Sequence, residues 1–119
     1  MTKSSEEGNG QGLGWLDFRT VSFDKNKLDK DIKIPHMGWE DIEDFSNSRI
    51  LRGFTESPRF YFLHSFHFEI RESKHFSAFV KYGYRFPAAF ETDNIYGVQF
   101  HPEKSGLFGM HFMENFIQI

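Results

Sequence analysis

The stretch that decides the fold is Ile95-Tyr96-Gly97-Val98-Gln99-Phe100-His101-Pro102-Glu103-Lys104-Ser105, near the C-terminus. Residues 95–100 have the apolar pattern of a strand, and this strand leads into a histidine and a carboxylate two residues apart. Side chains at i and i+2 of an extended backbone point to the same side. Pro102 fixes its own φ and restricts His101 to extended conformations. The stretch therefore predicts one imidazole held beside one carboxylate.

A histidine oriented by a carboxylate is the base portion of a nucleophilic site. The pair follows a strand and precedes a helix, which is where α/β folds place their sites. The same spacing also fits a strand end with a surface histidine and a solvated glutamate, and spacing alone does not separate the two. Ser65 and Ser105 were considered as nucleophiles, but neither lies in a strand–turn–helix elbow. The nucleophile is therefore missing from this chain.

Composition excludes several classes of protein. The 119 residues make one domain or part of one, and the net charge of −3 argues against general binding to nucleic acid or anionic membranes. The absence of cysteine excludes disulfides, thiolate zinc sites and a cysteine nucleophile from this chain. No segment approaches the roughly 18 apolar residues of a membrane span. We expect a cytoplasmic protein with no nucleic-acid or membrane partner.

Apolar periodicity predicts mainly short strands. The clearest is residues 60–69, in which both faces are apolar in the first half, as in a central strand. Residues 76–81 and 86–90 form two more strands around a turn at Tyr82-Gly83-Tyr84, and weaker strands are expected at 19–23 and from 32. Residues 40–47 are acidic and predict a solvated excursion. Residues 48–54 predict one or two helical turns.

One long helix is expected at the C-terminal end, with Ser105 as its N-cap. Its apolar side chains span a wide arc, which predicts deep packing against a sheet. Sixteen phenylalanines also require a large interior or a partner surface to cover them. Because one helix does not cover a sheet with two apolar faces, we predict an α/β fold that is part of a larger domain.

Four ordered motifs together resemble the glutaminase subunit of imidazole glycerol-phosphate synthase, a class I (triad-type) glutamine amidotransferase. They are Gly12-Leu13-Gly14-Trp15, Ile34-Pro35-His36-Met37-Gly38-Trp39, Phe60-Tyr61-Phe62-Leu63-His64-Ser65-Phe66 and Tyr96 to Ser105. The resemblance covers nearly the whole chain. It implies an incomplete flavodoxin-like fold with a mixed sheet and a C-terminal helix, in which residues 1–119 form a single partial domain.

The resemblance implies roles for the site residues in glutamine hydrolysis, which needs neither metal nor other cofactor. His101 is expected to be the general base and acid, and Glu103 the carboxylate that orients it. His64, Ser65 and Phe66 match the segment that lines the glutamine pocket. The family usually has tyrosine where this chain has Phe66, so one polar contact is lost.

The resemblance also implies a protein partner. Met37, Trp39 and Lys104 match family positions that face the synthase (cyclase) subunit, into which ammonia is passed. Glu40 stands at another such position, where the family commonly carries asparagine. We expect this glutamate to alter a hydrogen bond at the interface and to add a charge.

The front of the chain departs from the family pattern. Residues 1–8 look like the segment that follows the nucleophile elbow, so the catalytic cysteine and the oxyanion loop are expected upstream of Met1. A thioester cannot form without the thiolate. We therefore predict that this chain alone has no glutaminase activity.

Three alternatives stay open from the sequence. The ammonia acceptor could be a nucleotide-sugar amidotransferase of surface polysaccharide synthesis. A metal-dependent hydrolase could use His101, Glu103 and either His64 or His36, although no close metal-ligand spacing is present. The chain could also be a non-catalytic fragment that docks to a partner, and in isolation its uncovered apolar surface would then favour aggregation or partial folding.

Overall fold

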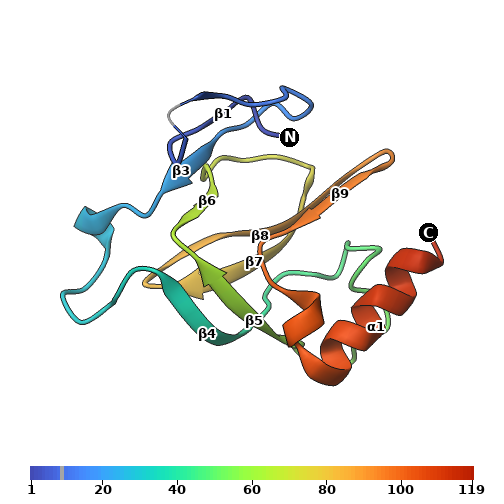
Figure 1. Ribbon diagram of the computed structural model, residues 1–119. Helices are drawn as coiled ribbons and strands as arrows, with labels where there is room; N and C mark the ends of the chain where they lie inside the picture. The colour runs from blue at the N-terminus through green and yellow to red at the C-terminus, as the bar shows by residue number, and fades with distance from the viewer. Residues whose placement is uncertain (9) are drawn as a thin grey trace.

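The computed structural model describes residues 1–8 and 10–119 (Figure 1). None of the helices in these residues is long and apolar enough to cross a membrane. The elements, in chain order, are β1 (Ser4–Ser5), β2 (Gly10–Gln11), β3 (Thr20–Ser22), the 3-10 helix η1 (Lys25–Lys27), β4 (His36–Asp41), β5 (Arg59–His64), β6 (Phe66–Phe68), β7 (Phe76–Tyr82), β8 (Tyr84–Thr92), β9 (Ile95–Val98), the 3-10 helix η2 (Pro102–Lys104) and α1 (Gly106–Ile117).

The described strands form three sheets. The first has the order β2-β1-β3-β6 and is mixed, because β1 and β3 run parallel while the other pairs are antiparallel. The second pairs β4 with β5, and the third has the order β7-β8-β9; both are antiparallel. A mixed sheet and a C-terminal helix confirm the predicted α/β class.

Strand β5 lies between two segments that matter for the site. One of its edges pairs with β4, in a register that sets His36 opposite His64 and Asp41 opposite Arg59. Along β5, the His101 N–H donates to the Tyr61 carbonyl at 2.9 Å. Both β4 and the segment that carries His101 are therefore hydrogen-bonded to the same strand.

Aromatic rings join β5, the segment before His101 and the helix. Phe60 stacks on Phe100 with ring centroids 4.1 Å apart, and Phe112 of α1 meets Phe100 edge-on at 5.5 Å. Phe60 is fully buried and the other two rings nearly so. Aromatic pairs of this kind contribute about 0.5–1.5 kcal/mol beyond the area that they bury. The residue that precedes His101 is thus anchored in the main core.

Three predictions about local structure were wrong. The strand expected over residues 60–69 is broken at Ser65, where the His64 ring hydrogen-bonds to the Phe66 carbonyl across the bend. The expected excursion at 40–47 begins within β4 and contains Ile42, which is fully buried. The segment 48–54 forms turns rather than helix; the Glu91 carboxylate accepts from the N–H groups of Arg49 and Ile50 there.

The expected deep packing of α1 was also wrong. Only Gly109, Phe112 and Asn115 are buried, and Leu107 and Ile117 keep about four-fifths of their surface. The helix lies at the side of the molecule away from β1 and β3 (Figure 1). The apolar side chains of α1 span a wider arc than the narrow face of the helix that the rest of the described chain buries.

We predict that Gly109→Ala destabilises the fold, although alanine normally favours a helix interior by about 1 kcal/mol over glycine. A Cβ at this position would overlap the Pro102 carbonyl oxygen, so α1 would have to move away from η2. Overpacking of this kind costs roughly 1–3 kcal/mol. Equilibrium unfolding in urea measures the change. Met110→Ala, at an exposed position of the same helix, is the control, and a stabilising Gly109→Ala would contradict the prediction.

Candidate active site

His101 and Glu103 lie in direct contact at the end of the segment that follows β9. The Nδ1 of His101 and the Oε1 of Glu103 are 2.8 Å apart, a distance typical of a hydrogen bond to a charged group. The Gln99 N–H donates to the Ala88 carbonyl of β8, which continues the pairing of β9 almost to the histidine. Pro102 then starts η2, which turns Glu103 back beside the ring.

The contact determines which nitrogen of His101 is available. Hydrogen bonds from the backbone N–H of Glu103 and from His101 lower the pKa of the Glu103 carboxyl, so this group is ionised and accepts. In the neutral ring, Nδ1 must then carry the proton, and Nε2 presents its lone pair. About a third of the His101 side chain is exposed. The arrangement can take a proton from a nucleophile at Nε2 while the carboxylate stabilises the resulting cation.

Ser105 holds this segment against β5. Its hydroxyl donates to the His101 carbonyl at 2.6 Å and accepts from the Tyr61 N–H at 3.0 Å. The residue is almost fully buried, and its hydroxyl makes no capping bond to α1. Ser105 is thus the N-cap residue of α1 by position, as expected, but its side chain does not make the usual capping bond. The serine instead joins the backbone of the candidate catalytic histidine to the adjacent strand.

The three residues expected at the substrate pocket lie at the junction of β5 and β6. His64 ends β5, Ser65 forms the bend, and Phe66 begins β6, where it pairs with Ser22. All three are half-buried. Burial lowers the pKa of His64 to about 4, so its ring is neutral at neutral pH. The segment that carries His101 is hydrogen-bonded to the same strand, because the His101 N–H donates to the Tyr61 carbonyl of β5.

Three of the four residues expected at the partner interface share one surface. Met37 and Trp39 project outward from β4 and are 60% and 47% exposed. The Trp39 ring meets Tyr61 edge-on at 6.1 Å, and the Lys104 ammonium lies 5.8 Å from the centre of the same tyrosine ring. Tyr61, which sequence reasoning did not assign to the interface, therefore links Trp39 to Lys104.

Glu40 lies on the other side of β4 from Met37 and Trp39. Its carboxylate is 3.4 Å from Nε2 of His36, a fully buried residue. From sequence, His36 was considered only as a metal ligand. The signal that could have placed it is the alternation along β4, since residues 36, 38 and 40 share one side of an extended strand.

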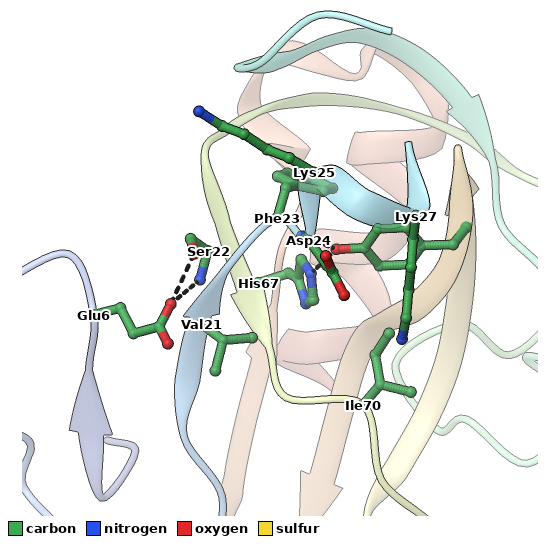
Figure 2. A pocket seen from close by; sticks show the side chains of 10 residues that line it. Glu6, Val21, Ser22, Phe23, Asp24, Lys25, Lys27, His67 and Ile70 are labelled. Atoms are coloured by element: carbon green, nitrogen blue, oxygen red, sulfur yellow. Dashed lines mark hydrogen bonds between the residues drawn. The ribbon is translucent and has the colours of Figure 1, made fainter. Parts of the chain in front are cut away.

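A surface pocket of about 450 Å³ lies elsewhere, next to β3 and η1 (Figure 2). Glu6 accepts there from the N–H and the hydroxyl of Ser22, and His67 hydrogen-bonds to the Tyr84 hydroxyl at 2.7 Å. His67 is buried with both ring nitrogens partnered, as expected of a core histidine. None of the predicted site residues lines this pocket.

A second hollow adjoins the candidate site. It is an apolar groove of about 600 Å³ that runs from Pro102 and Glu103 along the exposed side of α1. The side chains that make it apolar are Leu107, Met110, Met113 and Ile117. The candidate catalytic carboxylate therefore stands at the edge of an uncovered apolar surface.

Metal binding finds no support in the arrangement of ligands. Among residues 1–8 and 10–119, no three or more His, Asp or Glu side chains are grouped so that they could hold a metal ion. His36 and His64, both considered as ligands, instead hydrogen-bond to each other at 2.9 Å.

Comparison with known proteins finds a family model and several relatives that match this chain. The family model described as Glutamine amidotransferase class-I matches residues 10–119. Imidazole glycerol phosphate synthase subunit HisH 2 of Methanococcus maripaludis is 45% identical over 118 residues, which are 99% of this chain and 57% of that protein. The subunit HisH 2 of Pseudomonas aeruginosa is 42% identical over 97% of this chain and 55% of its own length. HisH of Leptospira borgpetersenii is 39% identical over a match that covers 100% of this chain and 58% of that protein. The chain thus spans little more than half the length of these relatives.

We predict that Ser105→Ala lowers the free energy of unfolding by about 1–3 kcal/mol, because the Tyr61 N–H loses its partner. Urea unfolding measures this loss. Ser77→Ala is the matched control, since Ser77 is also buried but its hydroxyl has no hydrogen-bond partner among the described residues. We expect the control to be neutral or stabilising. Equal effects of the two substitutions would contradict the role assigned to Ser105.

Proposed function

The chain belongs to the class-I glutamine amidotransferase family, and from this premise we propose that it forms the histidine-bearing part of a glutaminase that supplies ammonia to imidazole glycerol phosphate synthase in histidine biosynthesis. The family resemblance carried by the four sequence motifs is confirmed. Each of the three relatives named above is called a subunit of that synthase, so the nucleotide-sugar alternative is not favoured. We expect the protein to act in the cytoplasm.

The observation that carries the proposal is the 2.8 Å contact of Glu103 with Nδ1 of His101. With Nδ1 engaged, Nε2 takes the proton of a cysteine thiol, and the thiolate attacks the side-chain amide carbon of glutamine. The His101 cation then protonates the leaving nitrogen, which departs as ammonia and leaves a thioester. His101 next removes a proton from water, which hydrolyses the thioester to glutamate and restores the thiol. Glu103 stabilises the ring in both of its cationic states.

The thiol in this scheme comes from outside these 119 residues, which contain no cysteine. The apolar groove beside Glu103 supports this proposal, because exposed apolar patches of this kind mark interaction sites. We propose that the segment bearing the thiol packs near this groove and brings its sulfur to Nε2. The groove would then be covered in the active enzyme.

The proposed partner surface consists of Met37, Trp39, Tyr61 and Lys104. The surface joins an exposed tryptophan, a tyrosine and a methionine, which are residue types enriched in the cores of protein interfaces. Lys104 adds a positive charge beside them. The surface is carried by β4, β5 and η2; His64 ends β5, and His101 directly precedes η2. A cyclase subunit bound here would lie close to the point where ammonia is released.

A non-catalytic docking role is the second candidate function. The exposed side of α1 and the absence of cysteine both favour it for the chain by itself. The two candidate functions differ in whether they require His101: a glutaminase needs this histidine, and a docking fragment does not. The activity test below therefore separates the two.

We predict that the chain alone does not hydrolyse glutamine. Activity should appear when it is co-expressed with the part of the Methanococcus maripaludis relative that it does not match. In that complex, His101→Ala should lower kcat by roughly 10²–10⁴, the usual contribution of general acid–base catalysis. Release of glutamate measures the rate.

Glu72→Gln, which neutralises an exposed carboxylate outside both the groove and the proposed partner surface, is the control and should keep full activity. Hydrolysis by the chain alone would contradict the proposed source of the thiol. An active complex that is unaffected by His101→Ala would favour the docking role.

We predict that Trp39→Ala weakens binding to the cyclase subunit by about 2 kcal/mol, the threshold of an interface hot spot. Isothermal titration of the cyclase subunit with the complemented complex measures the change. Trp15→Ala is the matched control, because Trp15 is 62% exposed and lies outside the proposed partner surface. Equal losses for both substitutions, or no loss for Trp39→Ala, would exclude this surface as the interface.

A further inference from the structure

Three titratable side chains of β4 and β5 form one hydrogen-bonded row. Nε2 of His36 lies 3.4 Å from Oε1 of Glu40, and Nδ1 of His36 lies 2.9 Å from Nε2 of His64. At the end of the row, Nδ1 of His64 lies 2.9 Å from the carbonyl oxygen of Phe66. We call this row the Glu40–His36–His64 network.

The number of bonds in this network determines how many protons it holds. Three hydrogen bonds need three hydrogens, and the Phe66 carbonyl oxygen supplies none because it only accepts. Two neutral imidazoles supply one hydrogen each, and an ionised glutamate supplies none. The complete network therefore holds one proton more than two neutral histidines and a carboxylate would hold. Its total charge is zero.

Burial decides where the additional proton resides. His36 is fully buried, with its ring stacked between Phe62 at 5.0 Å and Tyr82 at 3.9 Å. Charging an imidazole here while ionising Glu40 would create two buried or half-buried charges, and their desolvation is costly. Placing the proton on Glu40 leaves all three groups neutral.

We infer that Glu40 is a positioning residue that stays protonated at neutral pH and donates a hydrogen bond to Nε2 of His36. His36 in turn donates from Nδ1 to Nε2 of His64, and His64 donates from Nδ1 to the Phe66 carbonyl. Every bond of the network then runs in one direction, from β4 through β5 to the bend that precedes β6. Both histidines are neutral and carry their proton on Nδ1.

The charged and titratable groups around the network shift the pKa values in the direction of this assignment. Burial raises the pKa of Glu40, Asp41 raises it further, and Arg59 of β5 opposes the shift. Burial lowers the pKa of His36 to about 3, with a further contribution from His64. Burial also lowers the pKa of His64 to about 4; the Phe66 carbonyl opposes this shift, while His67 and His101 add to it. The Tyr82 ring faces His36 from β7.

This inference does not depend on the proposed glutaminase function, because it concerns the protonation of the isolated chain. It revises the expectation that Glu40 adds a charge to the partner surface, since a protonated carboxyl is a neutral donor. It also assigns Glu40 a role in keeping His64, a candidate pocket residue, in one neutral tautomer. When Glu40 ionises, the network loses its first bond and β4 gains a charge beside Asp41.

NMR of the full chain tests the assignment directly. We expect the side-chain carboxyl carbon of Glu40 to have the chemical shift of a protonated acid at neutral pH and to titrate above the ordinary glutamate range. Long-range proton–nitrogen spectra should show His36 and His64 neutral and protonated on Nδ1. An ionised Glu40 at neutral pH, or a His36 that is protonated on Nε2, would overturn the inference.

Stability as a function of pH supplies a second test. A carboxyl whose pKa is raised in the folded state contributes stability below its ordinary value of 4.5, and this contribution is lost as pH rises through the raised pKa. Glu40→Gln keeps a donor for His36 but cannot ionise. Its stability relative to the native chain should therefore increase as pH rises.

Glu72→Gln, which removes an exposed carboxylate, is the control for the loss of one charge. We expect the pH-dependent gain in Glu40→Gln and not in Glu72→Gln, with urea unfolding at several pH values as the measurement. A gain of the same size in both variants, or a Glu40→Gln variant that loses stability as pH rises, would count against a protonated Glu40.

Discussion

The Ser105 hydroxyl makes the interaction on which the candidate site depends. It links the His101 carbonyl to the Tyr61 N–H, while the ring of Phe100 stacks on Phe60 one position earlier in each segment. A buried hydroxyl that both donates and accepts leaves no polar group unpaired at this junction. The polar link and the aromatic stack act on adjacent residues, so the backbone of His101 has little freedom to move relative to β5. With the backbone held in place, the hydrogen bond to Glu103 sets the orientation of the His101 imidazole ring.

The two faces of strand β5 carry side chains with different roles. Tyr61 joins Trp39 and Lys104 at the surface, whereas Phe60 and Phe62 enter the core. Alternation along β4 makes the same separation, because Met37 and Trp39 face outward while His36 and Glu40 face the interior. The proposed partner surface and the Glu40–His36–His64 network are thus two sides of one strand pair. A change in the protonation of Glu40 would therefore change the charge on the opposite side of β4 from Met37 and Trp39, which we propose to contact the cyclase.

Local patterns predicted part of this structure well. The expected strands at 76–81 and 86–90 lie within β7 and β8, and the turn between them is made at Gly83, whose φ is +73°. The expected strand at 60–69 is broken at Ser65, and its two halves pair with different partners, β5 with β4 and β6 with β3. Ile42 was expected in solvent among acidic neighbours, yet it is fully buried. Single apolar residues within charged segments carry no periodic signal, so their burial depends on what lies nearby in space.

The sequence by itself determined the family, the α/β class and the pairing of His101 with Glu103, because motif order and the constraint of Pro102 are properties of the local chain. Only the tertiary structure decided that the Ser105 hydroxyl bonds to β5 rather than to the first turn of α1, that Glu40 turns away from Met37 and Trp39, and that one side of α1 stays uncovered. Each of these depends on which segments meet across long sequence separations. Periodicity shows that a side chain is apolar or lies on a given face, but not which group it will meet there.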